Sequence, residues 1–224
     1  MKLYYHPAST VSRPVAMFIE DNAIPAEMQV VDLFTGEHLG PAYSAINPSQ
    51  LVPMLEDGDF RLTESSAILK YLADSIDSPA SPKGLKERAR VNEMMDWINT
   101  QLCRDLAYGC VYAQIFPSHK RPSDEAQRAT VAWGQERAKH WMGVLDQKLL
   151  GSDKPYLCGA QITIADYYGA SFVHLAEVVG SDMSAYPNVK AWLGRMKQRP
   201  TWDKVYAAIN GFAKQLPQGQ LATV

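Results

Sequence analysis

The stretch that most constrains this chain is a short strand that opens on a proline and leads, through a turn, towards a helix. Pro53 precedes the apolar pair Met54-Leu55, and Asp57-Gly58 is typical of a hairpin turn. Proline has no amide hydrogen, so at the first residue of a strand it marks a special turn, and the bond before it readily becomes cis. A second short strand then runs into a helix that begins Glu64-Ser65-Ser66. We expect these parts to form one compact unit of sheet and helix.

This unit carries the groups that hold a short peptide. The first turn of a helix leaves backbone N–H groups without partners, and hydroxyl groups beside them complete a site for a carboxylate. Ser65 and Ser66 stand at that point of the sequence. Strand-like hydrogen bonds from the backbone of Val52 would hold the main chain of the peptide. We therefore predict a peptide that runs from Val52 towards the start of the helix.

Hydropathy patterns predict a small α/β domain in the first third of the chain. The expected elements, in order, are a strand at 2–5, a helix at 11–22, a strand at 29–32, a loop with a short helix at 36–47, a hairpin at 54–62 and a helix at 65–75. The order βαβ, loop, ββα indicates a thioredoxin-like fold. No Cys-x-x-Cys pair occupies the turn between the first strand and helix.

Strand patterns disappear after residue 77. Two prolines and a glycine mark residues 78–84 as a linker, which divides the chain into a domain of residues 1–77 and an all-helical domain of residues 85–224. Apolar residues beyond the linker recur at helical spacing and predict helices at 91–116, 124–149, 164–178, 188–198 and 202–213. Ser123 is the expected cap of the second of these helices. Thr163 and Asp166 form a capping box, which we assign to folding alone.

Composition limits the partners. A formal net charge of -2 over 224 residues gives no reason to expect a nucleic-acid partner. No apolar run approaches the roughly 18 to 20 residues that a bilayer requires. The three cysteines lack disulfide or redox spacing, and no residues have metal-ligand spacing. We expect a cytoplasmic protein with no metal ion and no membrane partner.

A set of motifs follows in a fixed order along the chain. Ser9 stands four residues before Arg13, ahead of the first helix. The later motifs are Val31-Asp32-Leu33, Gly36-Glu37-His38-Leu39, Asn47-Pro48, Val52-Pro53, Asp57-Gly58, Leu62-Thr63-Glu64-Ser65-Ser66-Ala67-Ile68, Thr163-Ile164-Ala165-Asp166 and Tyr186-Pro187-Asn188. In this order the chain resembles the cytosolic glutathione transferases over residues 1–210, and theta- and delta-like bacterial members in particular. The resemblance implies glutathione as co-substrate, a thioredoxin-like domain before an all-helical one, and a homodimer.

The resemblance makes Ser9 the activator of glutathione. A hydroxyl that donates to sulfur favours the thiolate, and the positive end of the first helix assists. The free thiol has a pKa of about 8.5, and a shift of about two units corresponds to roughly 2.7 kcal/mol. Thr10 and Ser12 are alternative hydroxyls, and Tyr5 is a less favoured one. Ser9 as an ordinary loop or cap residue is the other interpretation.

The resemblance also assigns the remaining parts of glutathione. The backbone of Val52 would bind the cysteinyl part, with Pro53 in the cis form holding that strand edge open. Ser65 would bind the γ-glutamyl carboxylate through its hydroxyl and N–H, and Glu64 would bind the ammonium group. Ser65 and Glu64 also suit the first turn of a helix, so each can stabilise the helix start and bind glutathione at the same time.

His38 and Gln50 are the candidates for the glycyl carboxylate. Family members commonly carry Lys or His near the position of Gln50, and a neutral amide makes a weaker bond than a charged group. A second departure is Val11-Ser12, where theta and delta members often have Pro and Cys.

An aromatic stripe marks the predicted long helix. Tyr108, Tyr112 and Phe116 recur every four residues, with Arg104 one step earlier on the same face. In the family the electrophile site lies between this helix and the first loop, so these residues are predicted to wall an apolar pocket. A stripe that belongs only to the core is the alternative.

These assignments predict a transferase that joins the glutathione thiolate to apolar electrophiles by halide displacement, aromatic substitution or addition. A glutathione-dependent peroxide or disulfide reductase is an alternative, although the first loop has no cysteine for a mixed disulfide. A module that binds glutathione or another ligand without turnover is a further alternative from a different class.

Overall fold

A computed structural model describes residues 1–151, 153–217 and 219–224. Its first part is a four-stranded sheet in the order β2-β1-β3-β4. The parallel pair is β1 with β2, whereas β3 is antiparallel to both β1 and β4. The strands are β1 (Lys2–Tyr5), β2 (Glu27–Val30), β3 (Met54–Asp57) and β4 (Phe60–Leu62). The predicted thioredoxin-like arrangement is confirmed.

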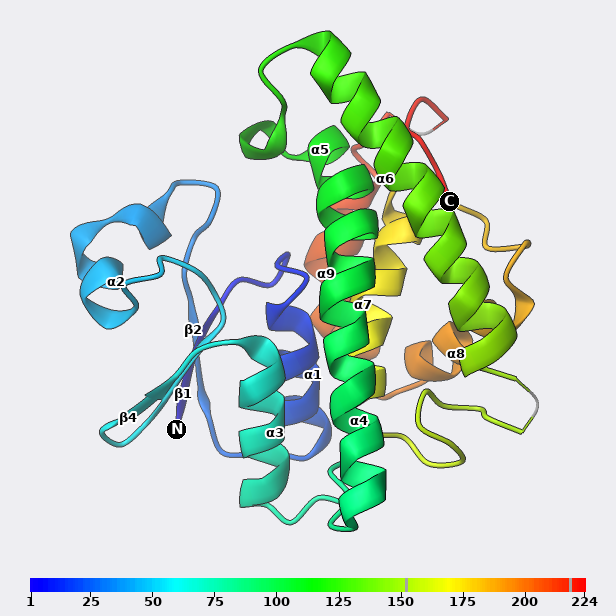
Figure 1. Cartoon of the computed structure of the whole chain (residues 1–224). Coiled ribbons are helices and arrows are strands. Elements are labelled where there is room, and N and C mark those ends of the chain that lie inside the picture. Colours follow the sequence, from blue (N-terminus) through cyan, green and yellow to red (C-terminus); the bar gives the residue numbers. More distant parts are fainter. Residues whose placement is uncertain (152, 218) are drawn as a thin grey trace.

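Helices cover both faces of this sheet (Figure 1). On the side of the helical domain lie α1 (Ser12–Asp21) and α3 (Ser65–Ser75), and beyond the other side lies α2 (Pro41–Ile46), after the short turn η1 (Glu37–Leu39). Residues 12–19 of α1 are all buried, because this helix also packs against the helical domain. On the opposite face of the sheet a smaller core consists of Tyr4, Val31, Tyr43, Val52 and Met54.

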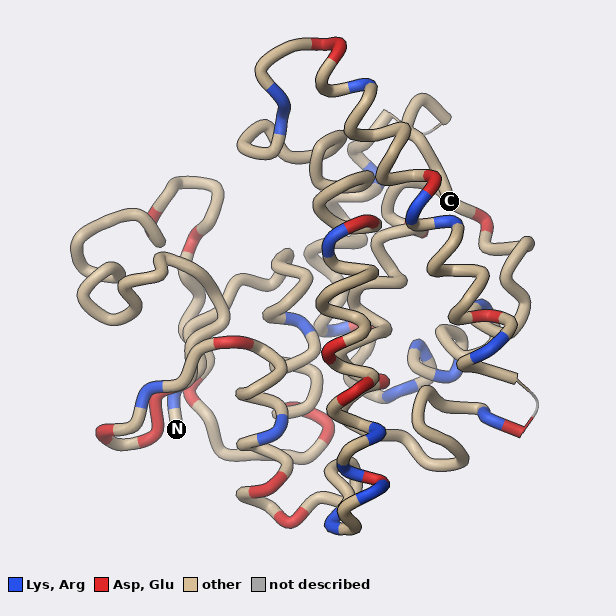
Figure 2. The backbone as a smooth tube through the Cα atoms, in the orientation of Figure 1, with Lys and Arg blue, Asp and Glu red and all other residues tan. Residues whose placement is uncertain are grey.

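The second part contains only helices and connections within the described ranges. Its front element is a long continuous helix made of α4 (Leu85–Trp97), the π-helical segment η2 (Ile98–Val111) and α5 (Tyr112–Ile115). The elements after it are η3 (Pro117–His119), α6 (Asp124–Val144) with its π-helical end η4 (Leu145–Leu149), α7 (Ile164–Val178), α8 (Pro187–Lys197) and α9 (Trp202–Ala213). Basic and acidic residues are interspersed over both domains (Figure 2).

Two predicted elements differ from the structure. The strand expected at 29–32 is β2 at Glu27–Val30, because its parallel register with β1 pairs Tyr5 with Val30 and ends the ladder there. The long helix begins at Leu85, six residues before the first apolar position of the predicted stripe, and its middle is π-helical. The predicted cap of α6 is confirmed, since the Ser123 hydroxyl accepts from the Ala126 N–H at 3.2 Å.

Two glycines allow η2 and α6 to cross closely. A Cβ added to Gly134 would lie 2.5 Å from the Gly109 carbonyl oxygen and 2.8 Å from the Cys110 amide nitrogen, both of them backbone atoms. Since backbone atoms cannot turn aside as a side chain can, any larger residue forces the helices apart. This crossing therefore depends on the absence of a side chain at position 134.

The Gly134→Ala variant is expected to lower the free energy of unfolding by about 1–3 kcal/mol, because it overpacks this crossing. Gly143 lies on the same helix with no atom within 4 Å of its hypothetical Cβ. Gly143→Ala is expected to be neutral or to stabilise by up to about 1 kcal/mol, since alanine is the better helix former. Urea unfolding of both variants measures the difference, and equal effects would contradict the close crossing.

Candidate functional site

Ser9 lies in the first loop, between β1 and α1, and is half-buried. Its N–H donates to the His6 carbonyl at 3.0 Å, and its carbonyl accepts from the Arg13 N–H at 3.1 Å. The Ser9 Oγ accepts from the Ser12 N–H at 3.3 Å. Because Oγ acts as acceptor in that bond, its own hydrogen remains available for donation.

The alternative hydroxyls of this loop are less accessible than Ser9. Thr10 is 5% exposed and Ser12 is fully buried. Burial raises the pKa of Tyr112 on α5, and the Thr10 side chain beside it lowers that pKa, so the Thr10 hydroxyl already faces another hydroxyl. The Ser12 Oγ accepts from the His6 N–H at 3.5 Å. Tyr5 lines a separate small cavity of about 70 Å³ near Lys204 of α9.

The peptide bond between Val52 and Pro53 is cis, as predicted. The Val52 side chain is buried in the smaller core, against Tyr4 and Tyr43. The Val52 backbone N–H and carbonyl form no hydrogen bond with another residue in the described ranges. The carbonyl before it, that of Leu51, is held by the Tyr43 hydroxyl at 2.7 Å. This combination leaves the Val52 amide and carbonyl groups unpaired on a fixed backbone.

Two strained residues flank Val52 along the chain. Gln50 has φ of 56° and Glu64 has φ of 64°, values that favour glycine. Strained backbone of this kind is concentrated at functional sites in proteins. Glu64 is exposed and immediately precedes α3, and Ser65 at the start of α3 is 5% exposed. Burial raises the pKa of Tyr168 on α7, and the adjacent Ser65 hydroxyl opposes that shift.

The Gln50 side chain is already hydrogen-bonded within its loop, whereas the His38 imidazole has a nitrogen without a partner. The Gln50 Nε2 donates to the Ser44 Oγ at 2.8 Å and lies 3.5 Å from the Leu39 carbonyl, so its amide hydrogens serve the loop. His38, half-buried in η1, has an Nδ1 without a hydrogen-bond partner. Burial lowers the pKa of His6, the charge of Asp32 raises it, and His38 lowers it further.

An aromatic wall, defined here as Tyr108, Tyr112, Phe116 and His119, runs along η2, α5 and η3. Successive ring centroids are 5.0 Å apart for Tyr108 and Tyr112, and 5.4 Å for Tyr112 and Phe116. His119 packs against these rings at 5.3–6.1 Å. Sequence reasoning missed His119, although its position three residues after Phe116 was a usable signal. The wall reaches the first loop, because Tyr112 meets Thr10.

Arg104 is not brought together with this wall. Its guanidinium pairs with Asp105, with Nε 2.7 Å from Oδ1 and Nη2 2.9 Å from Oδ2. Asp105 is fully buried and also accepts from the Trp141 Nε1 at 2.6 Å, on the side of α6. The shared helical face expected from the spacing therefore does not place the Arg104 guanidinium among the rings.

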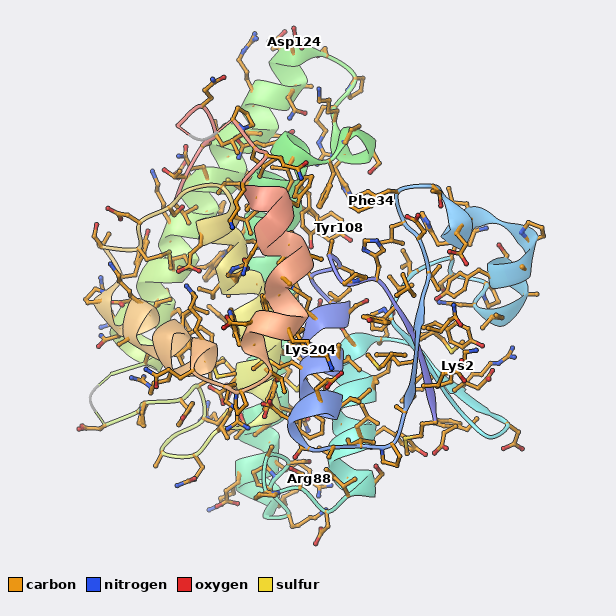
Figure 3. All side chains as sticks on the ribbon, turned by 180° about the vertical axis from the view of Figure 1, so that it is seen from behind. Lys2, Phe34, Arg88, Tyr108, Asp124 and Lys204 are labelled. Atoms are coloured by element: carbon orange, nitrogen blue, oxygen red, sulfur yellow. The ribbon has the colours of Figure 1, made fainter. Side chains whose placement is uncertain are left out.

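Phe34 is a second residue that sequence reasoning missed. It lies in the loop after β2, is 67% exposed and meets the His6 ring edge-on at 5.0 Å. Phe34 of the first domain and Tyr108 of the second lie on the sides of the two domains that face each other (Figure 3). Aromatic groups from both domains thus lie near the loop that carries Ser9.

No group of three or more His, Cys, Asp or Glu side chains in the described ranges is arranged to hold a metal ion. No described helix is both long and apolar enough to cross a bilayer.

The fold and the site define a two-domain protein whose thioredoxin-like half leaves the Val52 backbone unpaired next to cis-Pro53 and whose helical half adds an aromatic wall. The chain belongs to the glutathione S-transferase family: the model of the glutathione S-transferase N-terminal domain matches residues 8–75, and that of the C-terminal domain matches residues 110–200. It is therefore an enzyme of a family that uses glutathione as co-substrate.

The chain is similar in sequence to theta-class enzymes and in structure to enzymes of the theta and delta classes. The chain is 34% identical to glutathione S-transferase theta-1 of Bos taurus, over 88% of this chain and 82% of the relative. It is also 34% identical to the human theta-2 enzyme, over 88% and 80% of the two chains. A crystal structure of human glutathione transferase theta-2 with glutathione and an unknown ligand has a TM-score of 0.84 at 30% identity, covering 99% of this chain and 92% of that one. A delta-class enzyme of Nilaparvata lugens has a TM-score of 0.78 at 27% identity, covering 95% and 96%.

Proposed function

We propose that this protein conjugates the thiolate of glutathione to small apolar electrophiles, by halide displacement, aromatic substitution or addition to an activated alkene. Ser9 donates to the sulfur and keeps it ionised. The observation that carries this proposal is the Ser9 Oγ, which accepts from the Ser12 N–H and so keeps its own hydrogen available. The positive end of α1 adds to the same effect.

The proposed path of glutathione follows the unpaired backbone of Val52. The cysteinyl part bonds to the Val52 N–H and carbonyl next to cis-Pro53, groups that no described residue uses. The γ-glutamyl carboxylate meets the Ser65 hydroxyl and the start of α3, and its ammonium group meets Glu64. The glycyl carboxylate meets His38.

The electrophile is proposed to lie against the aromatic wall. Tyr108 is the most exposed ring of the wall at 49%, whereas Tyr112 is buried beside Thr10. Burial raises the pKa of Tyr108, and the charges of Cys103 and Glu64 raise it further. The Tyr112 ring packs edge-on against Tyr108, and Phe116 packs against Tyr112. The ion pair with Asp105 argues against a contact between Arg104 and the electrophile.

Turnover of several acceptors tests the proposed reaction. We expect conjugation of a chlorodinitrobenzene-type acceptor or an alkyl halide, with slower reduction of a hydroperoxide or a mixed disulfide. Preferred reduction would favour the reductase alternative. Capture on immobilised glutathione without turnover of any acceptor would favour a binding module.

Three properties of the family complete the proposal. We infer that the enzyme is theta-like, in line with the relatives named above. A homodimer with sites near the subunit boundary and a cytoplasmic location are both typical of this family.

Ser65→Ala and Glu64→Ala are each expected to weaken glutathione binding about 10-fold or more, because each removes a hydrogen bond to a charged group worth about 1.5–3 kcal/mol. Titration calorimetry with glutathione measures the dissociation constant. Ser75→Ala is the matched control, since its hydroxyl donates to the Leu72 carbonyl at the opposite end of α3. Unchanged affinity in both site variants would overturn the placement of the γ-glutamyl part.

A further inference from the structure

Arg13 carries a fully buried positive charge immediately behind the first loop. Its Nη1 donates to the Ala8 carbonyl at 2.7 Å, its Cζ lies 5.1 Å from the centre of the Tyr206 ring, and its Nε has no hydrogen-bond partner. Burial lowers its pKa, and no carboxylate in the described ranges pairs with it. A buried charge without a counter-charge is costly, so its retention beside the loop requires a reason.

Ser171, on α7 of the helical domain, reaches the same loop. Its Oγ donates to the Thr10 carbonyl at 2.6 Å, and its own carbonyl lies 3.4 Å from the Arg13 Nη2. Ser171 is fully buried. A hydroxyl of the second domain therefore bonds to the backbone of the first domain one residue after Ser9.

Together these contacts fix three consecutive peptide units. The Ala8 carbonyl is held by the Arg13 side chain, the Ser9 carbonyl by the Ser12 and Arg13 N–H groups, and the Thr10 carbonyl by Ser171. Because each peptide unit is planar, fixing the units on both sides of the Ser9 Cα fixes its φ and ψ. The direction of the Cα–Cβ bond, and with it the reach of the hydroxyl, follows from those two angles.

We propose that Arg13 and Ser171 form a loop clamp, in which the helical domain sets the direction of the Ser9 hydroxyl towards the glutathione sulfur. Ser171 is a positioning residue, because it acts through the Thr10 carbonyl and Ser9. Arg13 is a positioning residue as well, and its buried charge adds a fixed positive potential behind the loop. This inference rests on the proposed role of Ser9.

A double-mutant cycle tests the clamp. Ser171→Ala is expected to raise the thiol pKa of bound glutathione by about 0.5–1 unit and to lower kcat about 3- to 10-fold, with KM for glutathione within about twofold, since misdirection of a positioned group affects mainly kcat. In the Ser9→Ala background the same substitution is expected to change neither quantity further, because its effect passes through the Ser9 hydroxyl. Ultraviolet absorbance of the thiolate gives the pKa.

Tyr167→Phe is the matched control on the same helix. The Tyr167 hydroxyl also crosses the domain boundary, donating to Asp21 at 2.9 Å, but at the other end of α1. We expect it to lower the melting temperature and leave the thiol pKa unchanged. A general loosening of the interface would instead shift the thiol pKa in both single variants, and would overturn the clamp.

Arg13→Lys provides an independent variant, since lysine keeps the charge but loses the forked geometry. We expect it to raise the thiol pKa in the same direction as Ser171→Ala. If Ser9→Ala shifts the thiol pKa whereas Ser171→Ala and Arg13→Lys do not, the clamp is refuted and the role of Ser9 stands. If Ser9→Ala itself leaves the thiol pKa unchanged, the proposed activation of glutathione by Ser9 is refuted, and the clamp with it.

Discussion

Replacing Ser9 with alanine is expected to raise the thiol pKa of bound glutathione by about one to two units and to lower kcat about 10- to 100-fold near neutral pH. The variant loses the one loop hydroxyl that is both half-exposed and free to donate. Glutathione affinity is expected to stay within a few fold, because the groups proposed for its two carboxylates and its main chain remain. Stopped-flow turnover and thiolate absorbance measure the two effects.

The expected rise in thiol pKa also predicts how the activity of Ser9→Ala changes with pH. A higher thiol pKa leaves less thiolate at neutral pH. The activity of Ser9→Ala is therefore expected to rise with pH over a range where glutathione bound to the original enzyme is already ionised and its activity is constant. Above both pKa values the sulfur is ionised in each enzyme, and the difference in rate is expected to narrow. A constant ratio across pH would show that Ser9 does not act on ionisation.

Two substitutions complete the design. Ser9→Thr retains a hydroxyl and is expected to recover part of the activity. Thr10→Val removes the neighbouring hydroxyl, which already faces Tyr112, and is expected to leave the thiol pKa unchanged. A large shift in Thr10→Val would transfer the role of activator to Thr10.

Asp166→Ala is expected to lower the free energy of unfolding by about 3–5 kcal/mol, because it leaves several buried donors without an acceptor. The Asp166 carboxylate is fully buried and accepts from the Thr163 N–H at 2.7 Å and the Leu157 N–H at 2.8 Å. It also accepts from the Trp192 Nε1 at 2.9 Å, which joins α7 to α8. One side chain thus caps a helix, fixes a loop and anchors a tryptophan.

An exposed aspartate with similar local bonds is the control. The Asp182 Oδ1 accepts from the Ser184 N–H and hydroxyl, both at 2.8 Å, but Asp182 is exposed. Since water replaces a lost acceptor there, Asp182→Ala is expected to cost less than about 1 kcal/mol. Urea unfolding followed by circular dichroism compares the two, and a loss below 1 kcal/mol in Asp166→Ala would refute the central role of this carboxylate.

Local signals predicted most of the first domain. The hairpin around Asp57-Gly58 and the helix at 65–75 occur where turn chemistry and apolar spacing put them, and the bond before Pro53 is cis. The boundary of β2 differed by two residues, because the register of a parallel pair depends on its partner strand. The capping box of Thr163 and Asp166 forms as predicted. Local spacing did not predict that Asp166 also accepts from Leu157 and Trp192, because those residues lie outside the motif.

The candidate site also combines contacts that sequence patterns predicted with contacts that they did not. Helical spacing was sufficient to predict that Tyr108, Tyr112 and Phe116 touch. It was insufficient for Arg104, whose long side chain turns to a buried carboxylate next to it in the sequence. His119 lies three residues after Phe116, which was a usable signal, whereas Phe34 lies in a loop without periodicity.

The sequence by itself determined the order of elements, the cis bond before Pro53 and the family, because turn chemistry, apolar spacing and the order of motifs can be read along the chain. Only the tertiary structure decided which hydroxyl of the first loop remains free, where Arg104 points, and that Ser171 holds the loop from the other domain. The hold on the loop depends on the packing of α7 against α1, and hydrogen bonds between residues more than 150 positions apart leave no periodic pattern in a sequence. The direction of Arg104 depends on the buried Asp105 carboxylate, which also accepts from Trp141 of α6.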